Sequence, residues 1–406
     1  MAEVRDFNSY TGKKLNNDDT DDKQQPSYNE RIRNHKLVVM FRTFLLTAVF
    51  IIVISMIYIH WRDKSYSEAN ITKSVSVIDS TGASNTELDG QILRYSKDGV
   101  SLLDVAGEAL WNITYQMQNP IVHKCQGMAA IGDYNGHLIY IVNGTGQLGE
   151  IDTNLPIRDF CVSAQGVVAA ILDDTDVTWI YLYSSSGQEI ASFKTTMKDS
   201  GYPTAVSISP NAELVGVSYL YAKDGDIQTS VAFYNFGSVG QNEIDNYVSG
   251  YDYPGAVVPY MQFMTESSVF AVSDDRIMFY SGSEKPTSQA ENLVGEDQIK
   301  SVFSSSEYAG LVLYNGTTDG AYRLITYNTS GNKVAEIYFD LEYSDIIFDN
   351  NQIIIYNEDY FNIYDVDGHL KYEGQFERSV EALITTNVRS KFILVTEGQI
   401  LTMELR

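Results

Sequence analysis

A pattern of strand, glycine turn and strand recurs through residues 90–406 of the 406-residue chain. Short runs of Ile, Val, Tyr, Phe and Thr alternate there with turns of Gly, Asn and Asp, as in an all-β domain built of hairpins. Aligned on the glycine, the repeating segments are 102–108, 140–146, 181–187, 231–237, 277–282, 325–331 and 363–368. Successive glycines are 37 to 50 residues apart, close to the period of a four-stranded propeller blade. The seven matches predict a β-propeller of seven four-stranded blades. Six or eight blades stay open as alternatives, because the first and last repeats match least well.

The two ends of the domain suggest that the ring is closed. Residues 382–386, 392–396 and 400–404 follow the last glycine and supply most of a blade that lacks its outer strands. We expect residues 100–104 and 109–114, at the start of the domain, to complete it. A blade shared between both ends leaves no long free strand edge that could aggregate.

An apolar stretch at residues 37–60 precedes this domain. Arg42 is the only charged residue between residues 37 and 59. At about 1.5 Å per residue, roughly 20 helical residues cross a bilayer core of about 30 Å, so the stretch predicts one transmembrane helix. A cleaved signal peptide is the competing interpretation. Its apolar core would be only about 7 to 15 residues long and small residues would follow it, whereas Trp61, Arg62 and Lys64 follow here.

The residues around this helix predict its orientation. Lys and Arg are more frequent before it than after it, at positions 31, 33, 36 and 42 against 62 and 64. The positive-inside rule therefore predicts a cytoplasmic N-terminus and an extracytoplasmic propeller on the cell membrane. Residues 1–36 are polar and predict a disordered cytoplasmic tail, which is either a docking segment or a solvated leader. Residues 61–89 are rich in Ser, Thr and Asn and predict a linker.

Charge and cysteine content limit the possible partners. The formal net charge of −25 argues against binding to nucleic acid or to anionic lipid surfaces, because both carry negative charge. Cys125 and Cys161 are the only cysteines and each follows a proline by five residues, at what look like equivalent points of two repeats. They are a possible disulfide. Two buried thiols are the alternative, because equivalent strands of neighbouring blades can be too far apart to be bridged.

No catalytic, cofactor or metal site is expected from sequence motifs. Residues 144–149 match G-x-G-x-x-G, but strand and turn residues follow instead of the helix that would bind a pyrophosphate. Asp365, Asp367 and Gly368 resemble part of a calcium loop, yet they lack its ligand spacing and suit a hairpin turn. The chain contains neither a G-x-S-x-G nor an H-E-x-x-H motif. We therefore predict a protein without a cofactor or metal.

The most unusual segment, residues 246–254, is rich in tyrosine. Tyr247, Tyr251 and Tyr253 lie there beside Gly250 and Pro254. Rigid amphipathic rings of this kind form contact surfaces for sugars or peptides, so the three tyrosines are a candidate partner-binding loop. The alternative is that the rings pack beneath a connection between two blades.

Several local motifs resemble known propellers. Residues 207–211, Ser-Ile-Ser-Pro-Asn, are similar to the strand entry of TolB-type propellers. Together with residues 156–157, 201–203 and 233–237, the arrangement resembles a bacterial family of single-pass, WD40-like and quinoprotein-like propeller proteins with a domain of unknown function. The resemblance covers the helix and the whole domain. Trp111 and Trp179 are the only tryptophans of the domain, so the tryptophan docking of true quinoproteins is missing.

These features predict a membrane-anchored binding or scaffolding module of the cell envelope rather than an enzyme. Its partner would be an envelope protein or a cell-wall glycan, because a propeller presents many loops on one face. The alternative is an extracytoplasmic polysaccharide hydrolase or lyase, with carboxylates from different blades converging on the axis. A signalling receptor is a third possibility, but the sequence contains no evident transmission element.

Overall fold

The computed structural model describes residues 28–62, 65–77, 82–175, 177–195, 201–223, 225–295 and 297–406. The chain divides into two compact units, residues 1–64 and 65–406. In the first unit, α1 (Tyr28–Arg62) contains no Gly or Pro that would interrupt it. Its segment Lys36–Ile57 is long and apolar enough to cross a membrane and is not buried by protein. The helix begins before residue 37, so residues 28–36 of the predicted tail are helical; the rest of that tail lies outside the described residues.

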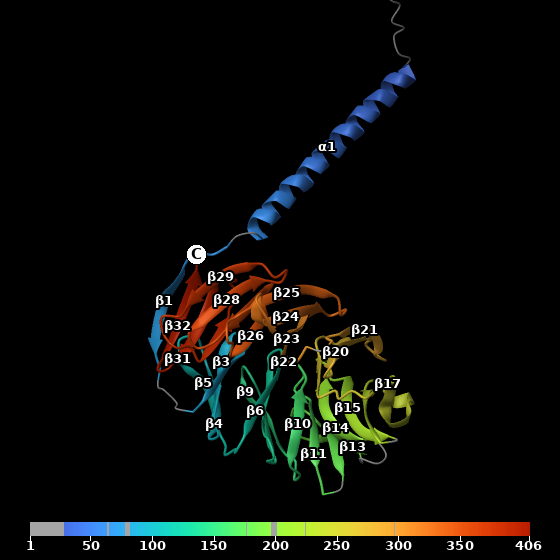
Figure 1. The fold of residues 1–406 in the computed structure, drawn as a ribbon, viewed down its shortest axis with the longest axis vertical. Helices are drawn as coiled ribbons and strands as arrows, with labels where there is room; N and C mark the ends of the chain where they lie inside the picture. The colour runs from blue at the N-terminus through green and yellow to red at the C-terminus, as the bar shows by residue number, and fades with distance from the viewer. Residues whose placement is uncertain are drawn as a thin grey trace, which may run out of the picture. The chain divides into compact units, whose positions relative to one another are not determined.

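The second unit is a β-propeller of eight four-stranded antiparallel sheets, which follow one another in chain order (Figure 1). Blade 1 comprises β2 (Ser84–Leu88), β3 (Gln91–Tyr95), β4 (Gly99–Leu103) and β5 (Ala109–Thr114), and blade 2 comprises β6 (Pro120–Cys125), β7 (Met128–Asp133), β8 (Leu138–Asn143) and β9 (Gly146–Asp152). Blade 3 comprises β10 (Ile157–Val162), β11 (Val168–Asp173), β12 (Thr178–Tyr183) and β13 (Glu189–Thr195). Blade 4 comprises β14 (Tyr202–Ile208), β15 (Leu214–Lys223), β16 (Asp226–Asn235) and β17 (Tyr247–Pro254). Two short 3-10 helices, η1 (Gly240–Asn242) and η2 (Ile244–Asn246), precede β17.

Blades 5 to 7 have the same order of strands. They comprise β18 (Tyr260–Phe263), β19 (Ser268–Val272), β20 (Arg276–Ser281) and β21 (Thr287–Leu293); β22 (Ile299–Ser304), β23 (Tyr308–Thr317), β24 (Gly320–Asn328) and β25 (Lys333–Phe339); and β26 (Asp345–Asp349), β27 (Gln352–Tyr356), β28 (Tyr360–Asp365) and β29 (Leu370–Gln375). Blade 8 consists of β30 (Ala382–Thr385), β31 (Lys391–Thr396), β32 (Gln399–Leu405) and β1 (Ala69–Ser76). First strands of neighbouring blades contact one another, so they form the inner wall of the ring.

The prediction of seven blades was wrong, because the structure has eight. All seven aligned glycine turns join the third and outer strands of blades 1 to 7. Blade 8 has no such turn, because its third strand, β32, ends at Leu405 and its outer strand, β1, comes from the start of the domain. A count of these glycine turns therefore misses blade 8, whose strands come from both ends of the domain.

The predicted sharing of a blade between both ends is confirmed, but with a different strand. The antiparallel pairing of β1 with β32 runs from Ala69 opposite Leu405 to Ser76 opposite Gln399, and the two strands lie side by side (Figure 1). The expected partners, residues 100–104 and 109–114, instead lie at β4 and β5 of blade 1. Both β1 and β2 lie within residues 61–89, where the composition predicted a linker. Their polar side chains suit outer and axial strands, because neither strand is fully buried.

The repeating glycine turn has a physical basis that is clear in blade 1. The Asp104 Oδ1 atom accepts hydrogen bonds from the backbone N–H groups of Ala106 and Glu108, at 2.8 and 2.9 Å. Gly107 has a φ of +79°, which favours glycine. A β-bulge follows in all seven hairpins. A side-chain oxygen at the corresponding position accepts one or both of the equivalent N–H groups in five other hairpins, at Asn143, Ser184, Asn235, Asn328 and Asp365.

The hydrophobic core is divided among the interfaces between blades. Eight clusters of buried side chains occur, each formed by residues of two neighbouring blades. The cluster between blades 8 and 1 closes the ring with Ile92, Leu103, Ile384 and Ile393. Burial of apolar surface between neighbours therefore stabilises every blade from both sides.

Candidate functional site

A pocket of about 630 Å³ lies between the first strands of blades 7, 8, 1 and 2. Its wall includes Glu87 of β2, Lys124 of β6 and Asp345 of β26. The turns after these first strands contribute Asp89, Asn350, Thr386 and Asn387. The pocket therefore opens on the face of the ring where first strands turn into second strands.

Lys124 links blades 1 and 2 at this pocket. Its Nζ atom donates to Thr86 Oγ1 at 2.9 Å and to the Glu87 carbonyl oxygen at 2.6 Å. The Glu87 carboxylate lies 3.7 Å from the same ammonium. A third of the Lys124 side chain is exposed, but loss of water around the ammonium lowers its pKa, against the opposing effects of Glu87 and Asp345.

Asp345 gives the pocket a second perturbed group. Burial raises its pKa, although the N–H of Ile346, 2.8 Å from Oδ1, and the Lys124 ammonium act in the opposite direction. Next to it, burial raises the pKa of Tyr356 to about 12, and the Tyr356 hydroxyl accepts the N–H of Leu383 at 3.4 Å. Clefts with perturbed ionisable groups are candidate binding sites.

The pocket carries more negative than positive charge. Its lining includes the carboxylates of Glu87, Asp89, Asp345 and Asp349 and the single ammonium of Lys124. Carboxylates that surround a concave surface attract cations, because low-dielectric walls focus the field. No motif in the sequence indicates this set of residues. Charged residues in short β-strands, such as Lys124 in β6 and Asp345 in the largely apolar β26, were the available signal, but the sequence does not reveal which first strands share a pocket.

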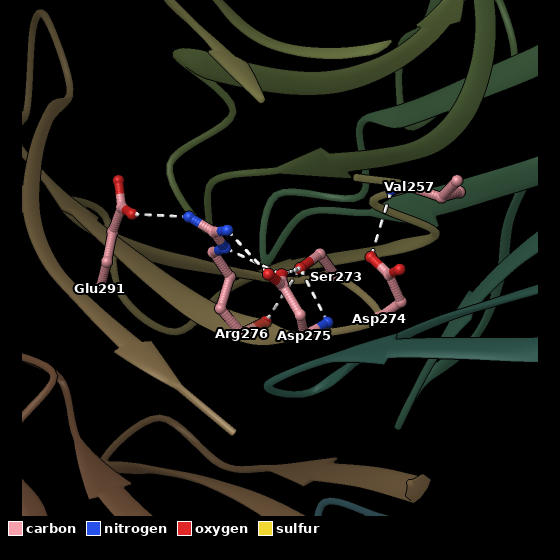
Figure 2. A network of polar contacts seen from close by, with 6 residues as sticks. All are labelled: Val257, Ser273, Asp274, Asp275, Arg276 and Glu291. Carbon is pink, nitrogen blue, oxygen red and sulfur yellow. Dashed lines mark hydrogen bonds and ion pairs between the residues drawn. The ribbon is translucent and has the colours of Figure 1, made fainter. Parts of the chain in front are cut away.

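A separate polar network in blade 5 supports the fold (Figure 2). The Arg276 guanidinium binds the Asp275 carboxylate through two hydrogen bonds, Nε to Oδ1 at 2.8 Å and Nη2 to Oδ2 at 2.7 Å. Its Nη1 atom also lies 3.3 Å from Glu291 on β21. The hydrogen bond from Arg276, ahead of the opposing effect of burial, lowers the pKa of Asp275 to about 2. Asp274 in the same turn accepts the N–H of Val257 at 3.3 Å, so the network holds the connection from blade 4 against blade 5.

The tyrosine-rich segment is a strand rather than a loop. Tyr247, Tyr251 and Tyr253 all lie on β17, the outer strand of blade 4. The Tyr253 hydroxyl is buried and hydrogen bonded to that of Tyr280 at 2.6 Å. The Tyr251 hydroxyl donates to the Pro286 carbonyl at 3.1 Å. Both rings therefore pack between blades 4 and 5, and Tyr247, 46% exposed, is the only one of the three that lies largely on the surface.

The two cysteines are free thiols on the first strands of blades 2 and 3. Cys161 is buried and Cys125 is partly buried, and burial raises the pKa of both thiols. A raised pKa keeps a thiol protonated and unreactive. The structure thus shows the alternative arrangement, two thiols packed near the ring axis.

Asp365, Asp367 and His369 bring possible metal-ligand atoms within 4.8 Å of one another. The Asp365 carboxylate is already engaged, however. Its Oδ1 atom accepts the backbone N–H of His369 at 2.8 Å, and its Oδ2 atom lies 3.1 Å from the Lys371 ammonium. These contacts fit the hairpin turn expected from the sequence.

Comparisons with known proteins agree with this architecture. A family of unknown function (DUF5711) matches residues 62–405. No curated protein matches the sequence. The C-terminal WD40 domain of Sif2 is 12% identical with a TM-score of 0.54, and the match covers 84% of this chain and 99% of that one. Sqt1 from Chaetomium thermophilum is 14% identical with a TM-score of 0.53, over 83% of this chain and 100% of that one.

BamB from Moraxella catarrhalis is 12% identical, with a TM-score of 0.47, and the match covers 83% of this chain and 100% of that one. At such low identity, the similarity to Sif2 and Sqt1 shows a shared fold alone. The resemblance to a WD40-like propeller family of unknown function is thereby confirmed.

Proposed function

This chain belongs to the DUF5711 family of unknown function, and we propose that it is a membrane-anchored propeller that serves as a binding scaffold in the cell envelope. Support for the anchor comes from the exposed apolar segment Lys36–Ile57. Support for the orientation comes from the excess of Lys and Arg before this segment, which favours a cytoplasmic N-terminus and an extracytoplasmic propeller.

The pocket between the first strands of blades 7, 8, 1 and 2, which we call the axial pocket, is the observation on which the proposal for binding rests. Four carboxylates and one ammonium line a cavity of about 630 Å³, within the range of about 300–1,000 Å³ that is typical of binding sites. A basic side chain on an extended segment of a partner protein suits this charge. The formal net charge of −25 would also accelerate the approach of a basic partner.

One of the four carboxylates of the pocket is engaged in a way that does not suit polysaccharide cleavage. Acid and base catalysis of that kind needs two carboxyl groups about 5 to 10 Å apart on either side of the bond that is cleaved. Here Lys124 lies 3.7 Å from the Glu87 carboxylate and is hydrogen bonded to the Glu87 backbone, so this carboxylate is held in an ion pair.

Site-specific cross-linking tests the binding site. A photoreactive amino acid replaces Asn387 at the pocket, in the full-length protein in cells, and a matched control replaces Glu266. Glu266 is exposed in the turn after the first strand of blade 5, on the same face but outside the pocket. We expect a discrete protein adduct from position 387 only, and its loss when Asp345→Asn and Asp349→Asn are combined. Equal adducts from both positions, or an adduct that survives this double substitution, would contradict the proposal.

A protease-protection experiment tests the topology independently. A C-terminal tag on the full-length chain should be digested by protease added to cells whose outer layers are permeable, while an N-terminal tag stays protected. Protection of the C-terminal tag in cells whose inner membrane is intact would place the propeller in the cytoplasm.

A further inference from the structure

A groove of about 630 Å³ separates blade 6 from blade 7, away from the axial pocket. One wall is the face of blade 7 formed by Tyr360 and Asn362 of β28 and by Glu373 and Gln375 of β29. Leu341, just after β25 of blade 6, contributes to the other side. The groove therefore lies between the outer parts of two blades.

The strand register places polar and aromatic groups side by side in this groove. Tyr360 pairs with Gln375 and Asn362 pairs with Glu373 across β28 and β29. Because alternate residues of a strand share one face, these four side chains project from the same face of blade 7. Residues on one face repeat about every 7 Å along a strand, which is similar to the length of one pyranose ring with its substituents.

The exposure of these side chains suits a ligand. The ring of Tyr360 is 46% exposed, whereas Tyr364 and Phe339 beneath the groove are buried. Glu373 and Gln375 are exposed, and their side chains make no hydrogen bond or ion pair with any residue that the structure describes. An exposed ring thus lies beside a carboxylate and an amide whose hydrogen-bonding capacity is available.

We propose that this groove binds a saccharide. The face of the Tyr360 ring would pack against the apolar face of a sugar, and the carboxylate of Glu373 and the amide of Gln375 would hydrogen bond to its hydroxyl groups. Asp340 and Glu373 both line the groove, and their charges disfavour phosphate-rich or other strongly anionic polymers. The ligand class is therefore a neutral or amino-bearing glycan. This inference does not depend on the axial pocket.

Saturation-transfer NMR on the full-length protein in lipid nanodiscs tests the inference. The probes are the soluble tetrasaccharides of N-acetylglucosamine, glucose and mannose. We expect at least one of them to receive saturation from the protein. Tyr360→Ala and Glu373→Gln should each weaken binding of that sugar at least tenfold. Tyr338→Ala is the matched control, because Tyr338 is 41% exposed on β25 but does not line the groove; it should bind normally.

Two results would overturn the inference. One is the absence of saturation transfer to all three tetrasaccharides in the wild-type protein. The other is binding that Tyr360→Ala and Tyr338→Ala reduce equally, since this would place the sugar elsewhere. The charge substitutions Asp345→Asn and Asp349→Asn should leave sugar binding unchanged. A negative result for sugar binding in the groove can therefore be distinguished from a negative result for partner binding in the axial pocket.

Discussion

Two partly buried groups near the ring axis should give the propeller an unusual dependence of stability on pH. His123 on β6 packs edge-on against Phe160, with ring centroids 4.7 Å apart, and burial lowers its pKa from 6.5 to about 4. Asp159 on β10 shows the opposite effect. Burial raises its pKa from 3.8 to about 6, against the N–H groups of Phe160 and Val206, which lower it.

The direction in which each residue changes stability with pH depends on whether the folded or the unfolded chain binds the proton more tightly. Below pH 6.5 the unfolded chain protonates His123 more readily than the folded chain, so this residue destabilises the fold as pH falls. Above pH 3.8 the unfolded chain ionises Asp159 more readily, so this residue destabilises the fold as pH rises. At about 1.36 kcal/mol per pKa unit, a rise from pH 5 to pH 7 adds about 2 kcal/mol of stability through His123 and removes about 1 kcal/mol through Asp159.

Single substitutions should separate the two contributions. Relative to wild type, the free energy of unfolding of His123→Gln should fall by about 2 kcal/mol between pH 5 and pH 7, and that of Asp159→Asn should rise by about 1 kcal/mol. Urea titration of the full-length chain in nanodiscs, followed by tryptophan fluorescence, measures these differences. The window begins at pH 5 because the sequence pI is about 4.4, where solubility is lowest. Parallel pH profiles for wild type and both variants, or shifts in the same direction, would refute the reasoning.

Two further substitutions test the packing of the blades by the same urea titration. Gly187 has a φ of +84°, and a Cβ atom there would lie 2.1 Å from the Glu150 carbonyl oxygen of blade 2, so Gly187→Ala should cost about 2 to 5 kcal/mol from backbone strain and overpacking. Gly255→Ala is its control, because Gly255 has a φ of +76° but no atom within 4 Å and should cost only about 1 to 2 kcal/mol; equal losses would rule out the clash. Lys371→Met leaves Asp365, which is 3% exposed, without the Lys371 ammonium 3.1 Å from its carboxylate and should cost about 3 to 5 kcal/mol. Adding Asp365→Asn should restore most of that loss, and a double variant no more stable than Lys371→Met would contradict this account.

Local chemistry explains why the architecture could be predicted. The capped turn of Asp104 with a positive φ at Gly107 requires particular residue types at fixed spacing, so it leaves a visible repeat in the sequence. The apolar stretch within α1 is equally local, because helix length and hydropathy are properties of consecutive residues. Both features could therefore be identified without knowledge of tertiary contacts.

The eighth blade shows where such reasoning fails. β1 pairs with β32 across more than 300 residues of sequence, and its composition resembles that of a linker because an outer strand buries few side chains. The tyrosines of β17 also depend on tertiary contacts. Their sequence does not reveal that Tyr251 and Tyr253 turn toward Pro286 and Tyr280 of the next blade.

The sequence by itself determined the apolar helix, the all-β class and the repeating blade, since each arises from residues close together in the chain. Tertiary structure alone decided the number of blades, the closing strand and the grouping of Glu87, Lys124 and Asp345 around one pocket. The physical reason is the closure of the ring: it brings first strands that are distant in sequence to a common wall, and no local pattern records which strands share it.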